Sequence, residues 1–132
     1  MAKQTQIGIG LDQRPGTLAR LCAALHRAGV NVQAISATGD LESCWVRIIA
    51  NPVGLAKTTL TEEGYHFTTQ RVLALRVTNE PGQLERIAGR LAREHININY
   101  IYGSNAEGPG TLIMSVSELD RAAAVLRDFS AE

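Results

Sequence analysis

The chain has 132 residues, of which 45% are hydrophobic, and it carries 13 acidic and 13 basic side chains. This length and composition are typical of a folded protein with one ordinary domain, or two very small ones that share a core. The balanced charge and the aromatic content of 5% argue against nucleic-acid binding, which needs a broad basic surface and rings that stack on bases.

The start of the sequence shows no targeting signal. Residues 1–6 contain no apolar run of signal-peptide length, and no window approaches the roughly 18 apolar residues of a membrane-spanning helix. Cys22 and Cys44 form neither a CxxC motif nor a metal-ligand spacing, so we expect two reduced thiols in or near the core. We therefore expect a cytoplasmic protein with no membrane partner, no metal and no cofactor.

The chain begins with a predicted strand and a predicted helix. Apolar residues first alternate, as in a half-buried strand, at Ile7, Ile9 and Leu11. The period then becomes helical, with apolar residues at i, i+3, i+4 and i+7: Leu18, Leu21, Cys22 and Leu25. Pro15 suits the start of this helix, because its missing N–H would have no intrahelical acceptor there.

A hairpin, a second helix and a further strand follow. Alternation returns at Val30 and Val32, and a turn rich in Gly, Asp and Ser separates them from another alternating segment. The dipeptide Asn51-Pro52 is typical of an N-cap and the first turn of a helix. A further strand is expected from about Tyr65. This order predicts an antiparallel sheet that carries both helices on one face.

The second half of the chain repeats the first at an offset of 66 residues. Residues 15–35 align with residues 81–101, and about one identity would be expected by chance. Eight of the 21 positions are identical: Pro15, Gly16, Leu18, Arg20, Leu25, Arg27, Asn31 and Ile35. The repeat predicts a second unit with its own first strand near Leu73, and Ser117 and Asp120 have the spacing of a capping box for its last helix.

The sequence therefore predicts an α+β fold of two ferredoxin-like βαββαβ units, residues 1–70 and residues 71–132. The second unit ends too soon after Phe129 for a full closing strand. We expect a neighbouring unit or a second chain to cover that edge of its sheet.

The repeated loops carry a resemblance to a known family. Residues 13–18 (QRPGTL), their copy at 79–84 (NEPGQL) and the Gly/His-Val/Ile-Asn-Val/Ile segment before the following strand are similar to those of ACT domains. These are βαββαβ modules that bind amino acids and regulate metabolic enzymes. From about Thr5 to Leu126 the chain resembles a free-standing tandem ACT protein. The resemblance implies a regulatory protein rather than an enzyme, with a small amino acid as ligand and an enzyme or regulator as partner in trans.

The start of each predicted helix is a candidate carboxylate site. The first turn of a helix presents N–H groups without intrahelical acceptors at the positive end of the helix dipole. Glycine there lets a ligand approach the backbone closely. The candidate amide donors are Gly16, Thr17, Leu18, Gly82, Gln83 and Leu84. The candidate side chains, four of them amides that can bind an ammonium group, are Gln13, Arg14, Asn31, Asn79, Glu80 and Asn97.

Other chemistries find weaker support. Gly8 and Gly10 lack the third glycine of a dinucleotide motif, and close packing on the sheet is the better explanation for them. His26, His66 and His95 share no metal-ligand spacing. An acylphosphatase-like hydrolase would need a loop arginine with a partner Asn, and Arg14 is a weak match.

Two structural alternatives stay open. The Pro-Gly turns can simply connect a strand to a helix, in which case the chain is an interaction module without a ligand. Trp45, Ile49 and Ile113 are predicted on the sheet face without helices, where an apolar surface favours a protein partner over water. We therefore expect a homodimer, with a contact between the two units of one chain as the alternative.

Overall fold

The computed structural model describes residues 2–78, 80–104 and 109–129. Their contacts form two compact units. Thr5–Gln70 is called the N-terminal unit here, and residues 2–4 with the described part of 71–132 are called the C-terminal unit. In the described ranges, no helix has the length and apolar character to cross a membrane. Whether residues 1–70 and 71–132 are also independent domains stays a prediction.

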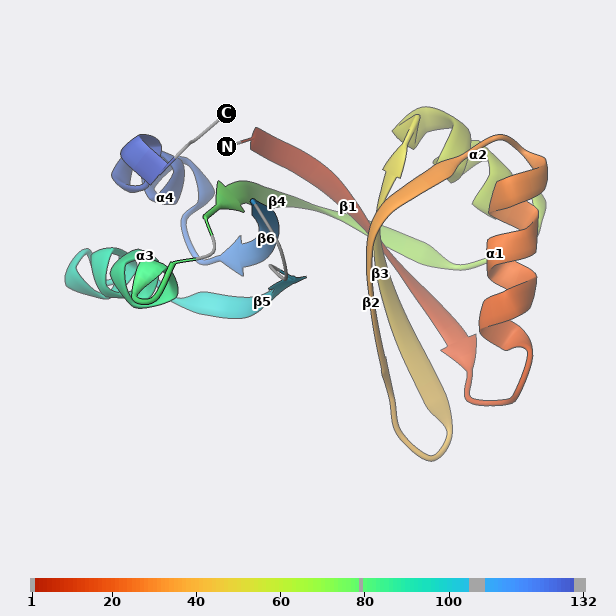
Figure 1. The fold of residues 1–132 in the computed structure, drawn as a ribbon. Coiled ribbons are helices and arrows are strands. Elements are labelled where there is room, and N and C mark those ends of the chain that lie inside the picture. The colour runs from red at the N-terminus through yellow and green to blue at the C-terminus, as the bar shows by residue number, and fades with distance from the viewer. Residues whose placement is uncertain (1, 79, 105–108, 130–132) are drawn as a thin grey trace. The chain divides into compact units, whose positions relative to one another are not determined.

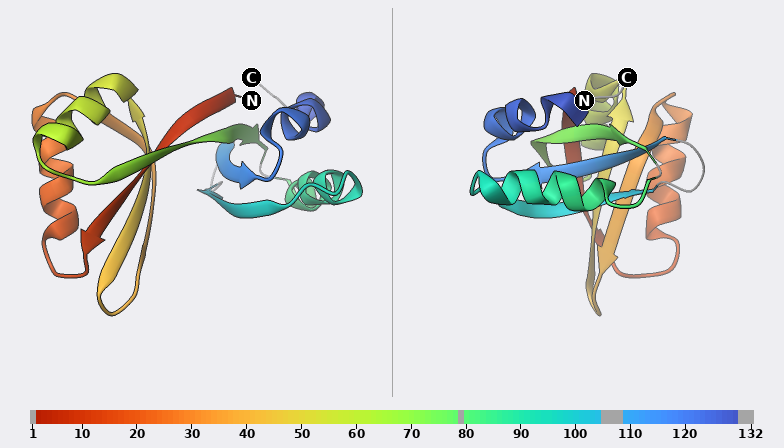
Figure 2. Two further views of the ribbon diagram at one scale, coloured as in Figure 1. Left: turned by 180° about the vertical axis from the view of Figure 1, so that it is seen from behind. Right: turned by 60° about the vertical axis from the view of Figure 1, so that its left-hand side comes forward.

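The N-terminal unit has the predicted βαββαβ order (Figure 1). Its elements are β1 (Ala2–Asp12, from Thr5), α1 (Thr17–Arg27), β2 (Asn31–Gly39), β3 (Ser43–Asn51), α2 (Val53–Glu62) and β4 (Phe67–Val77, to Gln70). The strand order is β2-β3-β1-β4, with β3 antiparallel to both β1 and β2. Both helices lie on one face of these strands (Figures 1 and 2), where they cover a core of alternating strand residues.

The C-terminal unit repeats this arrangement. It contains β4 from Arg71, α3 (Gln83–Arg93), β5 (Ile98–Ser104), β6 (Gly110–Val116), α4 (Leu119–Val125) and the 3-10 helix η1 (Arg127–Phe129). Its strand order is β1-β4-β6-β5, so residues 2–4 of β1 lie at its outer edge, where Lys3 Nζ is 2.5 Å from Asp120 Oδ1 of α4. The predicted α+β class with two ferredoxin-like units is confirmed.

Two strands that the sequence separates are one strand in the structure. The sequence predicted a strand from about Tyr65 and another first strand near Leu73, whereas β4 runs without a break from Phe67 to Val77. The segment contains neither Gly nor Pro, and Thr68 and Thr69 favour extended backbone. Nothing in it ends the strand between the two units.

The buried face of the first helix in each unit is narrower than the periodicity predicted. The fully buried positions are equivalent in the two helices: Leu21 and Leu25 in α1, Ile87 and Leu91 in α3. Leu18 is nevertheless 38% exposed and Leu84 56% exposed. Cys22 is exposed as well, so its prediction as a core residue is wrong, while Cys44 packs half-buried against the core. Cys22 follows Leu21 directly, which turns it about 100° away from the buried face.

Trp45, Ile49 and Ile113 do not form the predicted exposed face. Ile49 and Ile113 are each 3% exposed, and Trp45 alone is partly exposed, at 37%. The Trp45 ring lies against β1, where a Cβ added to Gly8 would be 2.4 Å from its Cζ2 atom. Close packing as the explanation for Gly8 is thereby confirmed. These three residues no longer support a dimer surface.

The first helices of the two units end in the same turn with different residues. Gly29 after α1 and His95 after α3 both have left-handed backbone, with φ of 84° and 58°. In both turns the next residue donates its N–H to the carbonyl five residues earlier, at 2.9 Å. This is the closure of a Schellman motif, which requires positive φ. Glycine adopts it freely, whereas a residue with a Cβ is strained there by about 1 kcal/mol or more.

We expect His95→Gly to raise the free energy of unfolding by about 1 kcal/mol, because relief of strain exceeds the added entropy of the unfolded chain. Urea unfolding followed by circular dichroism measures the change. The matched control is Gly29→His, which introduces the same strain at the same turn of the N-terminal unit and should be destabilising. If His95→Gly gives no gain, contacts of the imidazole offset the strain.

Arginine side chains hold the last described residues against α3. Arg90 donates two hydrogen bonds to the Asp128 carboxylate, at 2.5 and 2.8 Å, and a third to the Val125 carbonyl at 3.2 Å. Its guanidinium carbon also lies 4.8 Å from the centre of the Phe129 ring, and that of Arg86 lies 5.5 Å away. Phe129 is 7% exposed, so η1 closes this end of the C-terminal core.

The contact between Arg90 and Asp128 makes stability depend on pH. The hydrogen bond from Arg90 lowers the pKa of Asp128 below its usual value of 3.8. Because the folded-state pKa is the lower one, this stabilisation is complete above about pH 4 to 5 and is lost as the pH falls through the folded-state value. We expect Asp128→Asn to reduce the fall in Tm below about pH 4, and Arg90→Gln to do the same from the other partner. An unchanged acid slope in both variants would contradict this.

Candidate ligand-binding site

The two Pro-Gly loops have the same backbone geometry. Gly16 precedes α1 and Gly82 precedes α3 with φ of 94° and 87°, and neither helix has a side-chain hydrogen bond at its N-cap. The first helical N–H donates to the carbonyl three residues earlier, at 3.3 Å in both loops: Thr17 to Arg14 and Gln83 to Glu80. Each loop is therefore a tight turn that leads directly into the helix.

The turn decides which amide groups remain for a ligand. Because the Thr17 N–H is used within the loop, the donors at the start of α1 are those of Leu18 and Ala19, which have no intrahelical acceptor. The Thr17 hydroxyl is used too, since its single proton is shared between the carbonyls of Asp12, at 2.8 Å, and Arg14, at 3.1 Å. Ala19 was missed in the sequence, although its position in the first turn is a signal that could have identified it.

Charge distinguishes the two helix starts. The first turn of α1 contains no acidic residue, whereas that of α3 contains Glu85, which takes the repeat position of Ala19. Glu80 likewise stands in the second loop where Arg14 stands in the first. An acidic side chain in the first turn already compensates the helix dipole and repels a second anion. By charge, the start of α1 is therefore the better candidate for a carboxylate site.

A cavity of about 340 Å³ opens beside this first loop. Its lining includes Asp12, Arg14, Thr17, Arg20 and residues 64–66, the turn that follows α2. The volume lies in the range of small-molecule sites. Of the predicted site residues, two from the loop line this cavity: Arg14 and Thr17.

The cavity also contains residues that the sequence did not indicate. Asp12 Oδ2 accepts a hydrogen bond from Arg14 at 3.1 Å, which leaves Arg20 on α1 and His66 on the turn as further polar groups. In the sequence, Arg20 stands out only as one of the identities of the repeat. His66 is far from the loop in the sequence, so no local signal could have found it.

Gln13 lies against the β2–β3 hairpin and is not part of the cavity lining. Its N–H donates to the Glu42 carbonyl at 3.1 Å. Its side chain lies so close to Gly39 that an added Cβ there would be 2.4 Å from Nε2. The predicted role of Gln13 as a ligand of an ammonium group finds no support within this unit.

Asn31 and Asn97 lie at the opposite ends of α1 and α3 from the loops. Each follows its helix of 11 residues, which is about 16 Å long. The Asn97 N–H donates to Ser117 Oγ at 3.0 Å, and its carbonyl accepts from the Ser117 N–H at 3.0 Å. Ser117 therefore holds the start of β5. The prediction that Ser117 begins a capping box is wrong, because the N-cap of α4 is Glu118. Neither unit brings its Asn and its loop together.

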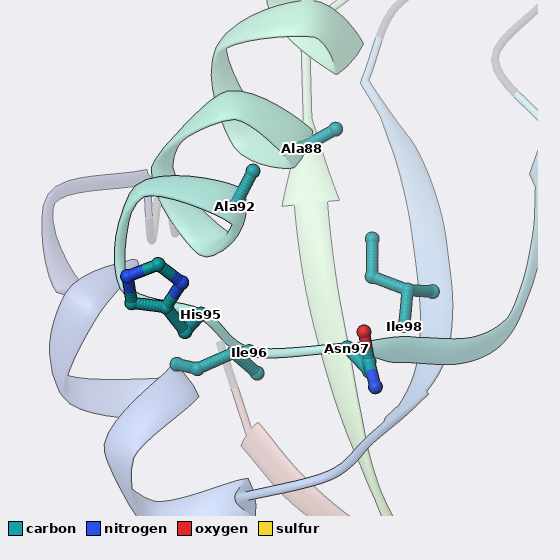
Figure 3. A pocket seen from close by; sticks show the side chains of 6 residues that line it. All are labelled: Ala88, Ala92, His95, Ile96, Asn97 and Ile98. Atoms are coloured by element: carbon teal, nitrogen blue, oxygen red, sulfur yellow. The ribbon is translucent and has the colours of Figure 1, made fainter.

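A second cavity, of about 420 Å³, lies at this far end of α3 (Figure 3). Ala88 and Ala92 of α3 and Ile98 of β5 line it, with His95 and Asn97 beside them (Figure 3). The lining is apolar at Ala88, Ala92, Ile96 and Ile98 and polar at His95 and Asn97.

Among the described residues, the other candidate groups do not come together as a binding or catalytic site. Asn79 lies outside the described residues, and the Glu80 carboxylate accepts a hydrogen bond from the Thr78 hydroxyl at 3.2 Å. In the described part of the chain, no three His, Cys, Asp or Glu residues are grouped to hold a metal ion. Arg14 pairs with Asp12, and Asn31 lies at the other end of α1, so the loop arginine and Asn of an acylphosphatase-like site are not together.

A family model and several solved structures resemble this chain. The family model for an ACT domain pair matches residues 2–129. A protein from Bacteroides thetaiotaomicron superposes with a TM-score of 0.91 at 21% identity, over 96% of this chain and 88% of that one. The ligand-free regulatory subunit of aspartate kinase from Thermus thermophilus superposes with a TM-score of 0.69 at 18% identity, over 96% of this chain and 93% of that one. The regulatory subunit of aspartate kinase from Thermus flavus superposes with a TM-score of 0.67 at 19% identity, over 96% of this chain and 90% of that one. No curated protein matches the sequence.

Proposed function

The chain belongs to the ACT domain family as a tandem pair, and on this premise we propose that it is a regulatory protein of the cytoplasm that binds a small amino acid at the start of α1. The α-carboxylate of the ligand accepts hydrogen bonds from the N–H groups of Leu18 and Ala19. Binding favours one packing of modules or subunits and so changes the contact with an enzyme or regulator in trans. The protein itself catalyses no reaction.

This proposal depends on one observation: no acidic side chain compensates the helix dipole at the start of α1. Both loops present the same backbone, but only α1 lacks an acidic residue in its first turn. It also has a cavity beside it. The fold shared with regulatory subunits of aspartate kinase supports the regulatory part of the proposal. The start of α3, with Glu85, is the weaker of the two sites.

A second copy of the chain completes the site in this proposal. In this proposal an adjacent module supplies amide groups for the ammonium, since each Asn lies a helix length from its own loop. The outer strands β2 and β5 offer free backbone edges for such an adjacent module. Exposed apolar residues recur at equivalent positions of the two units: Leu18 and Ile35 in one, Leu84 and Ile101 in the other, with Ile35 on β2 and Ile101 on β5. These residues support the homodimer in place of the face around Trp45.

Thermal melting in the presence of each of the twenty amino acids tests the proposal. A ligand at 100 times its dissociation constant adds about 2.7 kcal/mol to the free energy of unfolding, so Tm should rise clearly with the right amino acid. If none of the twenty raises Tm, the alternative of an interaction module without a ligand is the better description.

Ala19→Glu should weaken binding at the start of α1, because it gives this helix the acidic residue that α3 has at the same position. We expect at least about a tenfold loss of affinity without loss of stability, since an acid in the first turn is favourable to the helix. Isothermal titration calorimetry measures the affinity. The matched control is Ala19→Gln, which has the same size without the charge and should bind. Unchanged binding by Ala19→Glu would place the ligand elsewhere.

A further inference from the structure

The two units use an arginine at the same repeat position in different ways. In the C-terminal unit, Arg86 donates to Gln83 Oε1 at 2.8 Å and lies 5.5 Å from the centre of the Phe129 ring. Phe129 belongs to the segment that follows α4. In the N-terminal unit the counterpart is Arg20, which lines a cavity together with the segment that follows α2. Arg86 thus lies over an aromatic ring, whereas among the described residues no ring stacks on Arg20, although Tyr65 lines the same cavity.

Arg20 and His66 are exposed side chains that line this open cavity. Arg14 is paired with Asp12, the acidic residue that lines the cavity. Within the described ranges, the side chains of Arg20 and His66 make no hydrogen bond or ion pair with another residue. The charge of Arg20 is therefore available to a ligand that enters the cavity.

We propose that this cavity selects an amino acid that carries a carboxylate in its side chain. The inference rests on the proposed function: the α-carboxylate binds the amides of Leu18 and Ala19, and the second carboxylate binds Arg20, with His66 beside it. A guanidinium binds a carboxylate through two parallel hydrogen bonds, which are stronger than those to a neutral group. A side-chain amide of the same shape offers one oxygen and no charge. The acid should therefore bind at least about tenfold more tightly than its amide.

Calorimetric titrations with aspartate against asparagine, and with glutamate against glutamine, test this inference. We expect one acid to bind at least about tenfold more tightly than its amide, and Arg20→Gln to bring the two within about twofold. The matched control is Arg27→Gln, which removes an arginine from the last turn of the same helix, outside the cavity, and should keep the preference. His66→Gln should weaken binding of the acid more than that of the amide.

The outcomes separate this inference from the proposed function. If a neutral amino acid binds best and Ala19→Glu weakens that binding, the proposed function stands and the inference is overturned. If succinate or glutarate binds as tightly as the acidic amino acid and depends on Arg20, the anion site stands and specificity for amino acids is overturned. If neither amino acids nor dicarboxylates bind, both are overturned. Inorganic phosphate serves as the control for unspecific binding of anions.

Discussion

Phe129→Ala should lower the free energy of unfolding of the C-terminal unit by about 3 kcal/mol, the usual range for removal of a buried aromatic ring. Phe129 is 7% exposed and packs in the core cluster of this unit. Its removal also deprives the guanidinium groups of Arg86 and Arg90 of the ring that they cover. Native-state amide hydrogen exchange measures the effect, since it reports α3 and β6 separately from the N-terminal unit.

The control for this result is Arg127→Ala, which changes an exposed residue of the same 3-10 helix and should alter stability by less than about 0.5 kcal/mol. Phe129→Leu, which keeps most of the apolar volume, should give an intermediate loss. A loss below about 1 kcal/mol in Phe129→Ala would mean that the segment is not part of the core in solution.

Gly8→Ala should lower the free energy of unfolding by about 2 kcal/mol, because overpacking in a tightly packed region is destabilising. The added Cβ would lie 2.4 Å from Cζ2 and 2.9 Å from Cε2 of Trp45, so the indole must move. Trp45 is the single tryptophan of the chain. Its fluorescence therefore reports both the displacement of the ring and the unfolding of this unit.

Gly10→Ala is the matched control for Gly8→Ala. Both glycines lie on β1 against the same ring, but a Cβ on Gly10 would be 3.5 Å from it, an ordinary contact. Alanine there should be neutral or stabilising by about 0.5 kcal/mol, since it reduces the freedom of the unfolded chain. Equal effects of the two substitutions would show that the close approach at Gly8 does not exist in solution.

In the proposed function, the two copies of the repeated loop have different roles. The two loops have the same backbone geometry, so their difference lies in side chains: Ala19 against Glu85 in the first turn, and Arg14 against Glu80 in the loop. The C-terminal unit also has an aromatic ring under its arginines. In our proposal, the N-terminal unit therefore binds the ligand, and the second copy of the loop keeps a structural part.

The sequence by itself determined the elements and their duplication. The alternation at Ile7, Ile9 and Leu11 and the helical spacing that follows are local patterns, and local hydrogen bonding with burial of one face turns them directly into a strand and a helix. The recurrence of Pro15-Gly16 at Pro81-Gly82 likewise marked both helix starts to within two residues. The prolines were expected in the first helical turn, whereas each precedes a Gly N-cap and lies outside its helix.

The tertiary structure alone decided which residues meet. Cys22 has the spacing of a core residue, yet its exposure depends on how the helix is turned over the sheet. Asn31 follows α1 closely in sequence but lies a helix length from the loop, whereas His66 lies far away in sequence and lines the same cavity as Arg20. A period specifies the face of one element, while a binding site depends on the packing of several elements, which no local pattern encodes.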